Sequence, residues 1–179
     1  MKKIVCIMLL GFALLTQAQS KYMTKTGSVT FEASVPSFEE VKATNASTTA
    51  ILNSENGEFA ALILVKGFRL KNALMEEHFN ENYAESNTYP KATFKGTFKN
   101  FSSNKLSGTY TIDGTLTFHG VSKYLKDIKV TLTELDNILK LTGNFNVLAS
   151  DFKIDIPKIV SNKLSNEVAV NFEFELLEK

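Results

Sequence analysis

The sequence predicts an all-β domain of eight antiparallel strands, closed into a barrel or folded as a sandwich, with one amphipathic helix. Two patterns predict it. Apolar and polar residues alternate in eight stretches, as in strands with one buried face, and one further stretch repeats apolar residues every three or four positions. With 179 residues, 44% of them apolar, and no internal repeat, the chain is expected to build one core in one domain.

The first eighteen residues are predicted to be a signal peptide rather than part of the fold. Two lysines precede an apolar run from Ile4 to Leu15, about half the length that a membrane-spanning helix needs. Thr16 and Ala18 then supply small residues for a signal peptidase. We expect cleavage after Ala18, which leaves residues 19–179 as the domain, in a periplasm or secreted, with no stable insertion in a membrane.

Composition excludes several classes of function for the processed chain. The formal charge of +1 becomes −1 (18 − 19), because the leader carries two lysines and no acid, so no strongly basic nucleic-acid module is expected. Cys6, the one cysteine, lies inside the leader. The domain would therefore have no disulfide, no thiolate nucleophile and no cysteine metal site.

The strands are assigned to the alternating stretches in chain order. They are residues 29–35, 48–52, 59–65, 92–98, 110–118, 128–132, 139–147 and 168–176. Asn56-Gly57 between the second and third predicts a two-residue hairpin turn.

Two stretches break the alternation. From Leu70 to Tyr83 the apolar residues have helical spacing, which predicts the amphipathic helix. Residues 151–165 have a mixed pattern that Pro157 divides, and we expect a covering loop with one short helical turn.

The predicted inner face carries no Asp, Glu, Arg or His, and small residues stand among its phenylalanines. An eight-stranded barrel has room inside for side chains or for one small ligand. The small residues indicate either an apolar hollow or a filled core in which small and large side chains interdigitate. They are Ala33, Ala50, Ala61, Ala92, Gly96, Gly114 and Gly143.

Three motifs resemble the YceI-like family of exported bacterial, lipocalin-like proteins, often called polyisoprenoid-binding. Gly114-Thr-Leu-Thr-Phe-His-Gly-Val-Ser-Lys123 is similar to the family's Gly-x-Leu-Thr-aliphatic-His-Gly-Val-Thr-Lys strand. His78-Phe79 followed by Tyr89-Pro90 resembles its His-Leu pair and Tyr-Pro strand start. Asp151-Phe152 corresponds to Asp-Phe-Gly, with Lys153 in place of glycine. The family's opening Trp, Asp-Pro and His-Ser are missing here.

The resemblance implies an eight-stranded antiparallel lipocalin-like barrel with a helix at one side or end, able to hold a long apolar chain such as an isoprenoid. The shortened start of the domain would trim one end of the cavity. We expect the barrel interior and a helical lid to contact the ligand through Phe31, Phe59, Ala61, Ile63, Leu74, Met75, Phe79, Phe94, Phe98, Leu116 and Phe118.

The polar candidates have structural explanations. His119, beside Gly120 at a strand end, is expected to be a hydrogen-bonded structural histidine. His78 has glutamates nearby, but two separated histidines without cysteine do not make a usual transition-metal site. Glu76, Glu77 and Glu81 are expected to form a solvated helix face. No catalytic residue, metal or cofactor is predicted.

Three hypotheses follow. The favoured one is an exported binding protein that holds an isoprenoid, a quinone-like molecule or another long-chain lipid. An enzyme acting on such a lipid would need a polar group at the cavity mouth, from His78, Tyr83 or His119. A solid-cored stress-response protein is the third.

Overall fold

Eight strands form a closed barrel in the computed structural model, which describes residues 21–35 and 40–179. The predicted signal peptide, residues 1–18, lies outside the described residues. Each strand pairs antiparallel with its neighbours in the chain, and β8 pairs with β1. The all-β, eight-stranded lipocalin-like barrel is therefore confirmed, and the sandwich is excluded. The strands are β1 (Lys21–Ser34), β2 (Lys42–Asn53), β3 (Glu58–Leu64), β4 (Lys91–Phe98), β5 (Gly108–Phe118), β6 (Val121–Leu135), β7 (Ile138–Leu148) and β8 (Leu164–Glu178).

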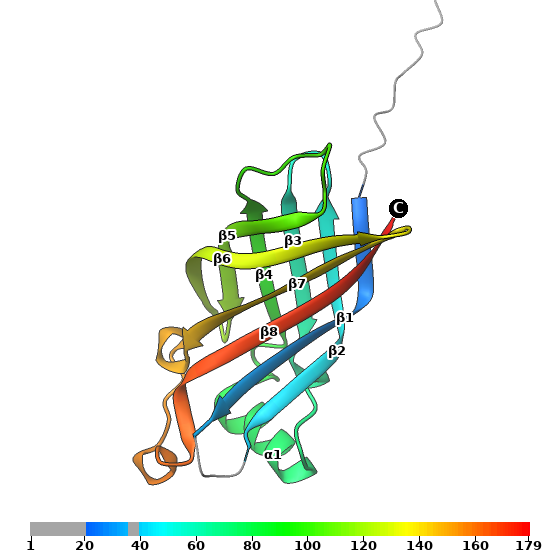
Figure 1. Ribbon diagram of the computed structural model, residues 1–179. Coiled ribbons are helices and arrows are strands. Elements are labelled where there is room, and N and C mark those ends of the chain that lie inside the picture. The colour runs from blue at the N-terminus through cyan, green and yellow to red at the C-terminus, as the bar shows by residue number, and fades with distance from the viewer. Residues whose placement is uncertain (1–20, 36–39) are drawn as a thin grey trace, which may run out of the picture.

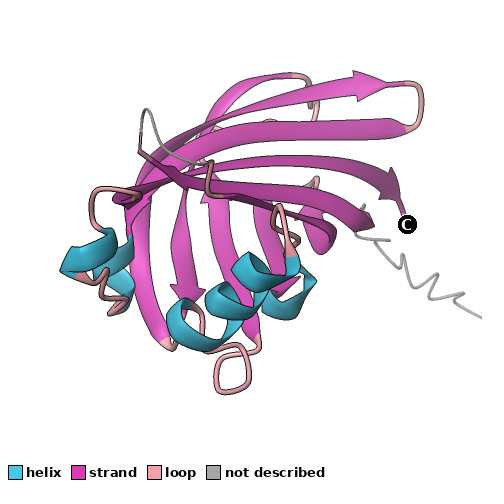
Figure 2. Cartoon of the chain, turned by 90° about the horizontal axis from the view of Figure 1, so that it is seen from below, coloured by secondary structure: helices cyan, strands magenta, loops and turns pink. Residues whose placement is uncertain are grey.

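The two ends of the barrel differ in what covers them (Figure 1). The β2–β3, β4–β5 and β6–β7 connections lie at one end, together with Lys21 and Lys179, and we call it the closed end. The opposite end, which we call the open end, carries every helical segment of the described chain, as Figure 2 shows from below. These segments are η1 (Val65–Gly67), α1 (Ala73–His78), the π-type turn η2 (Phe79–Tyr83), η3 (Ala149–Phe152) and η4 (Lys158–Val160).

Three strands, β1, β2 and β6, are much longer than predicted, because bulges reset the alternation that the prediction relied on. In β1 the register with β2 shifts on either side of Gly27, and two successive residues before it are exposed. In β6 the pairing with β5 shifts between Ile112 and Gly114, and Asp127 adopts a positive φ of 55°. A bulge inserts one extra residue, which exchanges the inward-facing and outward-facing positions. The apolar alternation on the two sides of a bulge therefore does not read as one continuous strand.

The Asn56-Gly57 signal marks a hairpin, but not the two-residue turn that was predicted. Leu52 pairs with Phe59, and the Gly57 N–H donates to the Asn53 carbonyl at 2.9 Å, which closes a four-residue connection. A two-residue turn occurs instead at His119 and Gly120, between the paired Phe118 and Val121. Both turn residues have positive φ, 49° and 70°, as the tight turns of twisted hairpins require.

The amphipathic helix is shorter than residues 70–83. Arg69 exchanges two backbone hydrogen bonds with Thr44, which keeps the chain extended up to the helix start. Asn72 caps α1 by accepting the Met75 N–H at 2.9 Å, and the helix continues into η2. Residues 151–165 contain the second half of η3 and all of η4 rather than one helical turn.

Candidate functional site

The closed half of the barrel is densely packed. Five inward leucines have exposures of 1% or less, and they lie toward this end on β2, β6, β7 and β8: Leu52, Leu132, Leu139, Leu141 and Leu176. Phe98, Phe101 and Tyr110 pack their rings at centroid distances of 5.6–5.8 Å and close the barrel there. Of these described residues, Leu141 alone borders the cavity of the other half.

The open half is hollow. A cavity of about 350 Å³ lies inside it, lined almost wholly by apolar side chains. Buried residues at mid-barrel, including Phe59, Ile112 and Phe174, form its floor. Toward the open end several inward side chains are only half-buried, among them Leu116 and Phe172. The barrel is thus neither filled nor hollow throughout, and the boundary lies near mid-barrel.

Nine of the eleven residues expected to contact a ligand line this cavity. They are Phe31, Phe59, Ala61, Ile63, Met75, Phe79, Phe94, Leu116 and Phe118.

Leu74 and Phe98 do not line the cavity. Met75, His78 and Phe79 share one helix face and line the space, whereas Leu74 points away and is 60% exposed. Phe98 is 3% exposed but lies in the packed half, with its ring centroid 6.3 Å from that of Phe59. The expectation that helix residues cover one end holds for two of its three members, Met75 and Phe79.

Many residues of the cavity wall were not among the eleven candidates predicted from the sequence. Phe145, Val147, Val168, Val170 and Phe172 line it from β7 and β8. All five stood on the predicted inward parity, so the alternation itself could have placed them in the wall.

Another part of the wall comes from the segment between β7 and β8. Its mixed apolar pattern gave no periodic signal, because the chain there forms short turns rather than a regular element. The lining residues of this segment are Ala149, Phe152, Ile154, Ile156, Val160 and Lys163.

The small inward residues form two groups with different neighbours. Ala33, Ala61 and Ala92 line the cavity. Gly96 and Gly114 face each other on β4 and β5.

These two glycines do not line the cavity, because the ring of Phe94 lies across the pair. A Cβ atom would come within 2.9 Å of the ring at Gly96 and 2.5 Å at Gly114. Gly143 is covered in the same way by Phe172. The three glycines therefore lie where large and small side chains interdigitate in a filled core, whereas the three alanines lie where the barrel is hollow. Both explanations of the small inward residues are correct, each for some of these residues.

Three phenylalanines attach the helical cover to the barrel. Phe31 of β1, Phe68 after η1 and Phe79 of η2 have ring centroids 5.1–5.8 Å apart. All three line the cavity. The cover is therefore held by apolar contacts that also form part of the ligand space.

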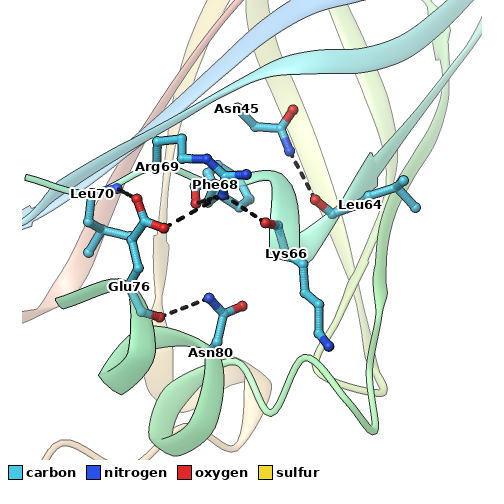
Figure 3. Close-up of polar contacts among 8 residues, drawn as sticks. All are labelled: Asn45, Leu64, Lys66, Phe68, Arg69, Leu70, Glu76 and Asn80. Atoms are coloured by element: carbon cyan, nitrogen blue, oxygen red, sulfur yellow. Dashed lines mark hydrogen bonds and ion pairs between the residues drawn. The ribbon is translucent and has the colours of Figure 1, made fainter. Parts of the chain in front are cut away.

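Polar contacts fix the start of α1 (Figure 3). The Glu76 carboxylate accepts the Leu70 N–H at 3.2 Å and lies 3.7 Å from Arg69 Nη1. Arg69 Nη1 also donates to the Lys66 and Phe68 carbonyls at 2.9 and 3.0 Å. Glu76, expected on a solvated helix face, is thus half-buried and structural.

The polar residues of the lining are few and stand toward the open end. They are His78, Tyr83, Lys163 and Ser165, with no Asp or Glu among the lining residues. His78 and Lys163 are the two lining residues classed as exposed, so they form the rim.

His119 is not in the lining. Its Nδ1 donates to the Phe152 carbonyl at 2.9 Å, and its ring packs edge-on against Tyr89 at 4.6 Å. Its Nε2 lies 3.3 Å from Glu85 Oε1, without the alignment of a hydrogen bond. The expected structural hydrogen bond of His119 is present.

Residues 21–35 and 40–179 contain neither a cluster of metal-ligating side chains nor a membrane-spanning helix. No three His, Cys, Asp or Glu side chains gather there around a possible metal position. No helix of this part of the chain has the length and apolar character to cross a membrane.

Closed topology and an apolar space open at one end define a lipocalin-like barrel with an interior cavity. The model of the YceI-like domain matches residues 17–176, and the chain belongs to that family. Comparison with curated proteins gave no match.

Several solved structures share the fold. A polyisoprenoid-binding domain from Saccharophagus degradans, implicated in plant cell wall breakdown, has a TM-score of 0.75 at 15% identity, covering 89% of this chain and 98% of its own. BcnA of Burkholderia cenocepacia has a TM-score of 0.69 at 16% identity, covering 83% and 95%. The YCEI protein of Campylobacter jejuni has a TM-score of 0.67 at 20% identity, covering 81% and 89%.

Proposed function

We propose that this protein binds a lipid with a long apolar chain, isoprenoid or quinone-like in character, and holds that chain in the open half of the barrel. The cavity carries the proposal: about 350 Å³ of space lined almost wholly by apolar side chains. Burying an apolar chain there gains roughly 25 cal/mol per Å² removed from water. The similar Saccharophagus degradans domain is a polyisoprenoid-binding domain, which supports this class of ligand.

The size of the cavity bears on how the ligand lies. Its volume is near the lower end of the ~300–1,000 Å³ typical of small-molecule pockets. The packed leucines and the rings of Phe98 and Phe101 block passage toward the closed end. The ligand therefore enters and leaves at the open end, and any part beyond the cavity's capacity stays at the rim.

Binding is proposed in preference to catalysis. His78 and Tyr83 line the cavity, but among the described residues neither side chain forms a hydrogen bond or ion pair with an acid, a base or a nucleophile of the lining. His119, the third polar candidate, is engaged with Phe152 behind the wall.

The deciding experiment is native mass spectrometry of the protein isolated from the cells that make it, followed by lipid extraction. A long-chain species bound at close to one-to-one ratio supports the proposal. Repeated recovery of empty protein that takes up no quinone, isoprenoid or fatty acid contradicts it.

We further propose that the protein is exported and processed, with a periplasmic or extracellular location. The intact mass of the processed protein should correspond to a chain that begins at Gln19. A mass that retains Met1 would contradict the proposed cleavage, without bearing on the cavity.

A further inference from the structure

The rim of the cavity has a distinctive charge. Among 35 lining residues, Lys163 is the one that carries a permanent charge, and no carboxylate is present. The other exposed lining residue, His78, is also a basic type. A ligand that enters tail-first leaves its head beside these groups.

Lys163 has no ion-pair or hydrogen-bond partner for its ammonium group among the described residues, and only its backbone N–H is bonded, to the Val160 carbonyl. Two other cations near the open end are engaged: Arg69 pairs with Glu76, and Lys123 with Asp151. Asp155 is not in the cavity lining but lines a second pocket, which shares Ile154, Ile156, Leu164 and Ser165 with the cavity.

We propose that the ligand is an amphiphile with an anionic headgroup, a carboxylate or a phosphate, which the Lys163 ammonium contacts at the rim. This inference rests on the proposed function, because it requires the tail to occupy the cavity. The remaining polar residues of the lining, His78, Tyr83 and Ser165, carry no carboxylate and can act as hydrogen-bond donors. An acidic rim would repel such a head, and none of the lining residues is acidic.

The size of the effect follows from the position of Lys163. An exposed cation is screened by water and salt, so the tail supplies most of the affinity and the head supplies selectivity. We expect an anionic head to bind about threefold to tenfold more tightly than an uncharged head on the same tail. The advantage should shrink as salt is raised.

The test uses three probes with one tail: palmitate, hexadecyl phosphate and hexadecanol. Each competes with the uncharged dye N-phenyl-1-naphthylamine for the processed protein, at low and high salt. Lys163→Gln removes the cation, and Lys158→Gln is the matched control, because Lys158 is exposed on η4 and does not line the cavity.

The inference predicts that one or both anions outcompete hexadecanol in the wild type and in Lys158→Gln, and that Lys163→Gln removes the advantage while hexadecanol is unaffected. Which anion gains identifies the headgroup. Equal binding of all three probes, or an anionic advantage that survives in Lys163→Gln, overturns the inference and leaves the proposed function standing. Failure of dye and probes to bind at all would overturn both.

Discussion

The carbonyl oxygen of Phe152 accepts a hydrogen bond from His119 Nδ1 at 2.9 Å, between residues 33 positions apart in the chain. A carbonyl can only accept, so Nδ1 carries a proton. Phe152 is 1% exposed, and its ring packs against Phe118 at 5.9 Å. The β5–β6 turn thus holds the cavity wall from behind.

Replacing His119 with Ala should lower the free energy of unfolding by about 1–2 kcal/mol, because it leaves the buried Phe152 carbonyl without its donor. Bound lipid should hardly change, since the contact with Phe118 still holds the Phe152 ring. Urea unfolding and lipid occupancy measured on the same sample test this. A selective loss of lipid at an unchanged melting temperature would place His119 in the binding site.

The paired alanines Ala61 and Ala50 offer a test of where the hollow begins. They lie opposite each other on β3 and β2, but only Ala61 lines the cavity. Ala61→Phe should fill ligand space, displacing lipid with little loss of stability. Ala50→Phe should overpack the core and cost about 1–3 kcal/mol.

Melting temperature and lipid occupancy, measured together, separate the two variants. If Ala61→Phe is destabilised as strongly as Ala50→Phe and no lipid is ever detected, the cavity does not act as a ligand space.

Shortening leucines in the two halves of the barrel should have unequal effects. Leu139 is fully buried in the closed half, so Leu139→Ala should cost about 2–5 kcal/mol. Leu116 lines the cavity and is half-buried, so Leu116→Ala removes fewer contacts and should cost clearly less. Denaturant unfolding of the ligand-free protein measures both. Equal losses would mean that the open half is packed in solution.

Asp113 should make the stability depend on acid pH. Its pKa lies below the usual 3.8, because its carboxylate accepts the Asp127 N–H and also pairs with Lys99 Nζ at 2.9 Å. A carboxyl group whose pKa is lowered by folding stabilises the fold above its unfolded pKa, and this stabilisation is lost as the pH falls through the folded pKa.

We therefore expect Asp113→Asn to lower the melting temperature at pH 7 and to differ less from the wild type below pH 3.8, the usual value. Asp136→Asn, in the β6–β7 turn, is the control, because no ion pair of Asp136 is found among the described residues. A difference that stays constant with pH would contradict this prediction, because it would show that the carboxylate charge of Asp113 does not stabilise the fold.

The barrel itself was predictable from the sequence, because alternating apolar residues record which side of a strand is buried. The ends of the strands were not predictable, because bulges at Gly27 and Asp127 exchange the inward-facing and outward-facing positions along the strand. Most of the residues expected to contact a ligand do line the cavity, because they were chosen from the inward-facing positions of the alternation. Parity does not report depth along the barrel, which is why Phe98 was grouped with Phe94 although it packs in the other half.

Other features depend on contacts between distant segments. The extended geometry at Arg69 comes from its pairing with Thr44, and no local pattern encodes where the helix must begin. The rim position of Lys163 likewise depends on how the β7–β8 connection folds back over the open end.

The pairing of β1 with β8 also dictates the order of folding. We call this β1–β8 pairing the seam of the barrel. Tyr22 pairs with Glu178, so the seam joins the two ends of the described chain. Closing so large a loop is entropically costly, and barrels that depend on such contacts fold slowly. The seam cannot form until the last strand has been synthesised, and until then β1 and β7 each expose an edge. Completion of the barrel therefore waits for β8, and the chain is most exposed to aggregation in the interval before it.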